Sequence, residues 1–189
     1  MSIEQKSSLS YKRIKSLARY ACVFSVLGVI ISIGTIAYYS VLMFMDTQAV
    51  DAAIREEFAA AGRAITINGV SRALTFMFEI TPVLIGVYIF SQAIQLFREY
   101  MSGRVFTFEA AKKLNKIGWA VAALAPLEIL SETLAVLALT IYNPPGQRQL
   151  SIGISETEIY AIILGLLLVT LAKILHEAAV ISEENQAII

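Results

Sequence analysis

The side chains best placed to do chemistry are two glutamates inside a long apolar run. Glu128 and Glu132 are four positions apart, so a helix would carry both carboxylates on one face. A carboxylate inside a bilayer is costly, and it normally faces other helices or a wet cavity and finds a partner there. Glu79 and Lys173 also stand in otherwise apolar stretches. Such a set can form ion pairs, pass protons or cations, or bind a ligand.

Position along the helices suggests a partner for Glu128. Glu128 and Lys173 each lie fourteen residues from the outer end of their apolar run, which is about 21 Å of helix. We therefore expect a Glu128–Lys173 pair, with Glu132 one turn nearer the outside. Three interpretations stay open: a structural lock between helices, a proton or cation relay through Glu79, Glu128 and Glu132, and a sensing or ligand pocket.

Other chemical motifs are missing from the sequence. His176 has no second histidine or cysteine at ligand spacing, so we expect an interfacial histidine and no metal site. No phosphate-binding glycine loop or nucleophile elbow is present, so we expect neither an enzyme nor a cofactor. Fifteen Lys and Arg residues balance fifteen Asp and Glu residues, which gives no electrostatic reason to expect direct contact with nucleic acid.

The elements that must position these residues are membrane spans. Hydrophobic residues make up 57% of the chain and charged residues 16%, whereas soluble domains have about 45–50% and ~25%. Four apolar runs could supply the roughly 20 residues that a bilayer requires. Residues 20–45 and 80–97 are uncharged, the third run carries Glu128 and Glu132, and the fourth continues past Lys173. We expect an all-α, four-helix transmembrane bundle in the lipid bilayer, forming one integral membrane domain over residues 1–189, with spans at about 20–45, 73–98, 117–142 and 159–181.

The first outer loop contains an amphipathic pattern. Val50, Ile54 and Phe58 recur at four-residue spacing, opposite Asp51. The spacing predicts a short helix that stops at Gly62, with its apolar stripe on the bilayer or on the top of the bundle.

The segment leading into the third span has clear helix-start signals. Gly103 can supply the left-handed turn that ends the second span, and Thr107 can cap the next helix with Glu109 in its first turn. Small residues, among them Gly28 and Gly165, allow close helix approach within this bundle or in a homo-oligomer. A basic turn then runs directly into the span: Lys112, Lys113 and Lys116.

The distribution of basic residues predicts the orientation. With four spans, eleven Lys and Arg residues lie on the side of the two termini and four on the other side. Cytoplasmic loops are enriched in these residues, so we expect a multi-pass inner (plasma) membrane protein with both termini in the cytoplasm. Aromatic residues mark both headgroup levels: Tyr20, Tyr100 and Trp119 on the inner side, and Tyr38, Tyr39, Tyr142 and Tyr160 on the outer side.

Two segments carry a family resemblance. The run from Gly103 through Phe106 and Thr107 to Gly118, and the ending from Leu175 onward, resemble a bacterial membrane family, domain of unknown function 2975. Its members are predicted to have four spans, a Gly–Phe–Thr or Gly–Phe–Ser segment before the third, and an acidic ending. Here Gln186-Ala187 stands where the family often has an acidic or Leu–Thr pair.

The resemblance implies no known activity. Genes of this family often neighbour a small helix-turn-helix regulator, which suggests a membrane protein that restrains or informs a transcription factor. Such a role would use the cytoplasmic loop and the C-terminal tail. We therefore expect a regulatory or interaction protein, with a small transporter or proton-coupled component as the alternative. The docking candidates are Phe106, Thr107, Glu109, Lys112, Lys113, Lys116, Glu183, Glu184 and Asn185.

Overall fold

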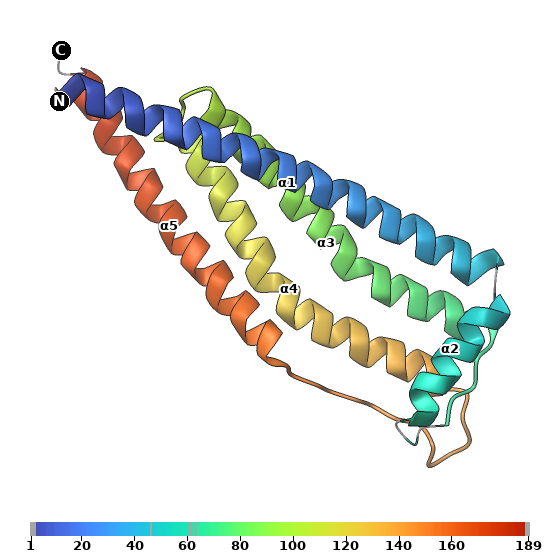
Figure 1. Ribbon diagram of the computed structural model, residues 1–189. Helices are drawn as coiled ribbons and strands as arrows, with labels where there is room; N and C mark the ends of the chain where they lie inside the picture. Colours follow the sequence, from blue (N-terminus) through green and yellow to red (C-terminus); the bar gives the residue numbers. More distant parts are fainter. Residues whose placement is uncertain (1–2, 46, 61, 63, 188–189) are drawn as a thin grey trace.

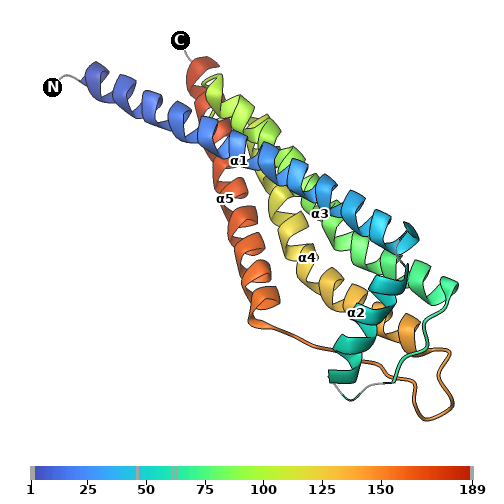
Figure 2. The ribbon, with the colours of Figure 1, turned by 45° about the vertical axis from the view of Figure 1, so that its right-hand side comes forward.

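The computed structural model describes residues 3–45, 47–60, 62 and 64–187 and shows five helices. Four long helices pack in chain order as an open, curved row, each against the next, with a short helix across one end (Figures 1 and 2). Each long helix is long and apolar enough to cross a membrane, so the all-α, four-span prediction is confirmed. The helices are α1 (Ile3–Met45), α2 (Thr47–Ala60), α3 (Gly69–Met101), α4 (Phe108–Thr140) and α5 (Glu156–Ala187).

The open row buries few side chains, and the core lies where α3, α4 and α5 meet. Leu96, Ala110 and Ile117 form its centre. Helices that are apolar on every face are expected where lipid replaces water, because lipid tails solvate the outward side chains. The exposed apolar surfaces of α1 and α5, at the two edges of the row, therefore fit a membrane protein.

Small residues set the closest helix contacts. Gly165 of α5 lies against Ala122 of α4, and Gly118 of α4 lies against Val169 of α5. Gly28 of α1 faces the ring of Phe90 in α3. The small-residue positions at Gly28 and Gly165 therefore pack within the chain.

The amphipathic helix predicted in the first outer loop is present as α2. The chain leaves it through Gly62, which has a φ of 67°, as expected for a glycine in the left-handed region. Arg72 of α3 holds α2 with two short contacts to the carboxylate of Asp51, both at 2.8 Å. Asn68 and Ser71 form a reciprocal cap at the start of α3, a few residues earlier than the sequence predicted.

The segment between α4 and α5 differs most from expectation. It does not simply bridge two neighbouring helix ends, because residues 147–155 run back along α4 (Figure 1). The hydroxyl of Thr140 bonds to the backbone of Gln149, and the hydroxyl of Thr133 donates to the carbonyl of Ser151 at 3.0 Å. As a result α5 begins about nine residues short of the end of α4, level with Ser131, instead of beside that end.

The two ends of the molecule are different in character. At one end lie the start of α1, the end of α5 and the turn between α3 and α4, and we call this the basic end (Figures 1 and 2). At the other, the α2 end, Asn143 ties two loops together by donating to the carbonyls of Ala64 and Gln147. Thr66 also donates to Asn143, at 2.6 Å. The start of α1 and the end of α5 lie at the same end of the molecule, as an even number of consecutive spans requires (Figures 1 and 2).

Candidate functional site

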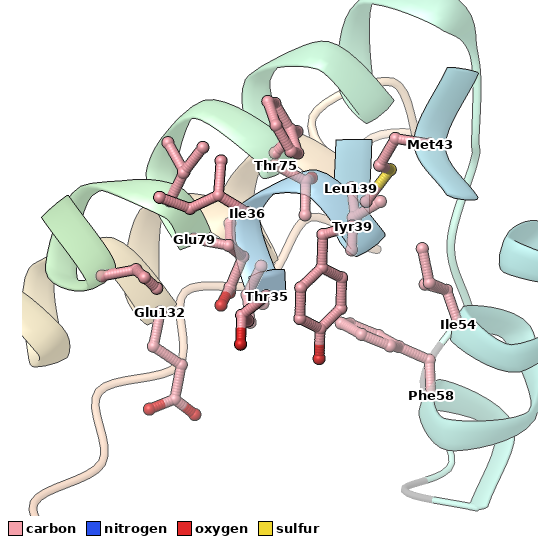
Figure 3. A pocket seen from close by; sticks show the side chains of 15 residues that line it. Thr35, Ile36, Tyr39, Met43, Ile54, Phe58, Thr75, Glu79, Glu132 and Leu139 are labelled. Carbon is pink, nitrogen blue, oxygen red and sulfur yellow. The ribbon is translucent and has the colours of Figure 1, made fainter. Parts of the chain in front are cut away.

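A cavity near the α2 end brings two of the predicted acids together. It has a volume of about 540 Å³ and is lined by side chains from α1, α2, α3 and α4. Glu79 of α3 and Glu132 of α4 both line it. Figure 3 shows Tyr39 and Phe58 on the side of the cavity toward α2, with the two glutamates on the other.

The two acids line the same cavity because they are level with each other on neighbouring antiparallel helices. Glu99 of α3 and Lys113 of α4 pair at 3.1 Å at the basic end. Glu79 lies twenty residues before Glu99, and Glu132 lies nineteen residues after Lys113, so both are about 30 Å along antiparallel helices from that pair. The third acid, Glu128, does not line the cavity.

The predicted pair between Glu128 and Lys173 is wrong. The Gly165–Ala122 and Gly118–Val169 contacts set the register of α4 and α5, and four residues further along α5 Lys173 is level with Leu114. Glu128 is fourteen residues beyond that point, about 21 Å away along the axis. The prediction assumed that the two helices began at the same depth, whereas the chain folds back along α4 before α5 starts.

The neighbour that α5 brings to Glu128 is another acid. Glu158, in the first turn of α5, is close enough for the two carboxylates to repel each other. Glu128 itself is half-buried. A Glu128–Lys173 ion pair therefore does not lock α4 to α5, and the close contacts described between these helices are the small-residue ones at Gly165–Ala122 and Gly118–Val169.

The basic end is held by one carboxylate with two cations. Glu99 accepts from Lys113 at 3.1 Å and pairs with Arg104 at 2.8 Å, which fixes the turn between α3 and α4. Gly103 within that turn has a φ of 87°, as its predicted left-handed role requires, and faces the ring of Tyr11 in α1. Thr107 caps α4 by accepting from the backbone of Ala110.

The other predicted docking residues surround this turn. Phe106 is 63% exposed, and His176 of α5 packs on the ring of Phe108 with 4.9 Å between centroids. Lys113 is partly buried by its ion pair with Glu99, so it is less available to a docking partner than the sequence suggested. Asn185 lies in the last turns of α5, and its side chain is outside the described part. The remaining docking candidates are exposed: Glu109, Lys112, Lys116, Glu183 and Glu184. Lys173, which was predicted as an intramembrane residue, is also exposed.

Some residues that shape the site were missed in the sequence. Tyr39 was assigned only to the membrane interface, yet it lines the cavity, and Arg72 was counted only as a loop charge, yet it holds α2. Glu79 and Glu132 lie at nearly equal distances along the sequence from the Glu99–Lys113 pair. That spacing could have indicated that the two acids are level with each other. Within the described residues, no three His, Cys, Asp or Glu side chains group together as metal ligands.

Comparison with known proteins gives a family and no function. No curated protein and no solved structure matches the chain. Residues 59–189, which include α3, α4, α5 and the turn at the basic end, match a family described as protein of unknown function (DUF2975). That range covers more than half of the chain, and the protein therefore belongs to the DUF2975 family.

Proposed function

We propose that this is a regulatory protein of the inner membrane that binds a cytoplasmic protein at its basic end. Both termini lie in the cytoplasm under this proposal, because the basic residues gather at that end. The family resemblance suggests a helix-turn-helix transcription regulator as the partner. The membrane protein would restrain or release that regulator and would not itself contact nucleic acid.

One observation carries the proposal: the turn at the basic end is fixed in shape but displays a large aromatic side chain. Glu99 is 18% exposed and holds both Arg104 and Lys113, whereas Phe106 is 63% exposed. Aromatic and Arg side chains dominate binding energy at protein interfaces. A turn already held in place loses little conformational freedom when a partner binds, which favours affinity.

Charge indicates what kind of partner surface fits. Lys112 and Lys116 are exposed beside the turn. An acidic partner surface would complement them and speed association. Anionic lipid headgroups can satisfy the same lysines, so the test must separate a protein from a lipid.

A photo-crosslinking amino acid placed at Phe106 in native membranes tests the proposal. We expect one protein adduct, identified by mass spectrometry, and its loss when Arg104→Glu reverses the neighbouring charge. The same probe at Leu150, an exposed apolar residue at the α2 end, is the matched control and should give no such adduct. Lipid adducts alone at Phe106 would overturn the proposal.

Transport is the second candidate, because Glu79 and Glu132 share one cavity. Replacing Glu79, Glu128 and Glu132 together by Gln should abolish uptake into proteoliposomes if the protein is a proton-coupled transporter. The same replacement should leave the Phe106 adduct unchanged if docking is the function. The two measurements therefore distinguish the candidates.

A further inference from the structure

We infer that this chain assembles with copies of itself through the two edges of its helix row. The outer face of α1 in one copy contacts the outer face of α5 in the next. Among the described helices, α1 contacts only α2 and α3, and α5 contacts only α4. Each edge helix therefore keeps one long face that no other helix of the same chain covers (Figures 1 and 2). The turn between α3 and α4 lies between the edges, so this contact is independent of the docking proposed above.

Opposite charges gather on the two edges at the basic end. Residues 11–19 of α1 carry four exposed cations and no acid: Lys12, Arg13, Lys15 and Arg19. Residues 177–184 of α5 carry three exposed acids and neither Lys nor Arg: Glu177, Glu183 and Glu184. None of these side chains forms an ion pair within the described part of the chain. The positive α1 edge therefore complements the negative α5 edge of another copy.

The two charged groups lie at matching depths. Three contacts set the relative heights of neighbouring helices: Gly28–Phe90, Glu99–Lys113 and Gly165–Ala122. Counted from these contacts along the antiparallel helices, Glu177 is level with Ser16, which lies between two of the cations in the sequence. Glu183 is two residues, or about 3 Å, from the level of Lys12. A second copy inserted in the same orientation would bring its acids to the height of these cations.

Toward the α2 end, each edge carries a mainly apolar exposed stripe. On α1, exposed residues recur at alternating three- and four-residue steps: Leu17, Tyr20, Phe24, Leu27, Ile31, Gly34 and Tyr38. The same steps on α5 give Tyr160, Ile163, Leu167, Thr170 and Ile174. A repeat near 3.5 residues keeps one face toward a neighbouring helix along its length. Lipid tails can also solvate these stripes, so the charges are what select another copy.

Charge also decides which edges pair. An α1–α1 contact would oppose cations and an α5–α5 contact would oppose acids, whereas α1 against α5 pairs unlike charges. A contact between two different surfaces closes into a ring when the rotation between copies allows it, and the helix row is already curved (Figures 1 and 2). Two copies that each supply both edges form the smallest closed assembly.

Disulfide cross-linking of two differently tagged copies in native membranes tests the contact. Cys22→Ala removes the native thiol. One copy then carries Leu27→Cys and the other Leu167→Cys, at positions within about one residue of the same level. We expect an oxidation product that carries both tags. Leu27→Cys with Leu84→Cys, at an exposed residue of α3 between the edges, is the control and should give none.

Charge reversal separates a specific contact from random collision. Glu177→Lys on α5 should lower the initial rate of the Leu27–Leu167 cross-link by at least about threefold, because a cation then meets cations. Glu109→Lys makes the same change of charge at the same end, between the edges, and should leave the rate unchanged. Both changes add positive charge at the basic end, so neither opposes the orientation proposed above.

The products decide the outcome. Ile31→Cys with Ile163→Cys, again nearly level, repeats the test if the first pair perturbs folding. A single chain that carries both Leu27→Cys and Leu167→Cys should give one closed product of defined size. The inference would be overturned by no mixed product from either pair, by an equally strong product from two Leu27→Cys copies, by equal rates in the two lysine variants, or by an open ladder of products.

Discussion

Replacing Gly165 by alanine tests whether α4 and α5 are set by backbone contact. A methyl group at Gly165 would lie 2.7 Å from the Cα atom of Ala122. Carbon atoms pack at about 3.5–4.0 Å, so the helices would have to separate by about 1 Å. The neighbour is main chain, so no side chain can rotate out of the way.

The magnitude follows from two opposing effects. Overpacking a close contact costs about 1–3 kcal/mol, and a gap of about 1 Å forfeits up to half of the dispersion energy along the contact. Alanine returns up to about 1 kcal/mol because it is the better helix former. We expect a net destabilisation of about 1–2 kcal/mol, or a fall in Tm of roughly 3–6 °C for a chain of this size.

Gly86→Ala is the matched control, because a methyl group there would meet nothing within 4 Å. It keeps only the gain in helix propensity and should be neutral or stabilising by up to about 1 kcal/mol. Gly28→Ala should fall between the two, because its neighbour is the ring of Phe90, which can rotate. Thermal unfolding of the purified variants in one detergent, followed by size-exclusion chromatography, measures the series.

The result that would refute the reasoning is specific. If Gly165→Ala and Gly86→Ala had the same Tm, the α4–α5 contact would not be as close as the structure shows. The register derived from it would then lose its basis, and the correction of the Glu128–Lys173 pair would have to be withdrawn.

Three further predictions concern the two ends of the molecule. Lys113→Met should lower the free energy of unfolding by about 1–3 kcal/mol because its partner Glu99 is mostly buried. Arg104→Met, at an exposed position, should lower it by less than about 1 kcal/mol. Urea titration in one detergent compares the two variants, and a larger loss for Arg104→Met would contradict the conclusion that Lys113 is the stronger partner of Glu99. Asp51→Arg should release α2 and expose residues 62–68 to protease, and adding Arg72→Asp should restore protection; an unrescued double variant would show that the pair does not hold α2. Alkaline phosphatase fused after Gln149 should be active, whereas a cytoplasmic location of this fusion would reverse the orientation.

The spans, α2 and the start of α4 could be predicted because their signals are local. Long apolar runs predict that the spans exist, and four-residue spacing predicts the apolar face of α2. Gly103 and Thr107 together predict where α4 begins to within a few residues. The structure bears out each of these. None of them depends on which helices are neighbours.

The depth of α5 could not be predicted, because it depends on bonds between residues far apart. Thr133 and Thr140 hold residues 149 and 151 along α4, and a threonine within an apolar run gives no sign of which carbonyl it will meet. The four-residue spacing predicted that α2 lies on the bilayer or on the top of the bundle, but it does not indicate the cavity that Ile54 and Phe58 line. The acids were identified correctly as a set, but their grouping was wrong: Glu79 and Glu132 share the cavity, and Glu128 lies beside α5.

The acids also bear on where the bilayer lies around this fold. Gly28 of α1 faces Phe90 of α3. The two helices are antiparallel, so Tyr39, eleven residues after Gly28, is level with Glu79, eleven residues before Phe90. The start of α5 reaches the same level, since Glu158 is close to Glu128. Exposed tyrosines therefore share one level with the acids, as expected at a headgroup boundary. A slab about 30 Å thick with one face at this level would reach the basic end. The carboxylates would then lie at the edge of the slab, where a charge costs far less than at the centre. By this placement α2 and residues 143–147 would lie beyond the slab, in the part where Asn143 donates hydrogen bonds to the carbonyls of Ala64 and Gln147 and accepts one from Thr66.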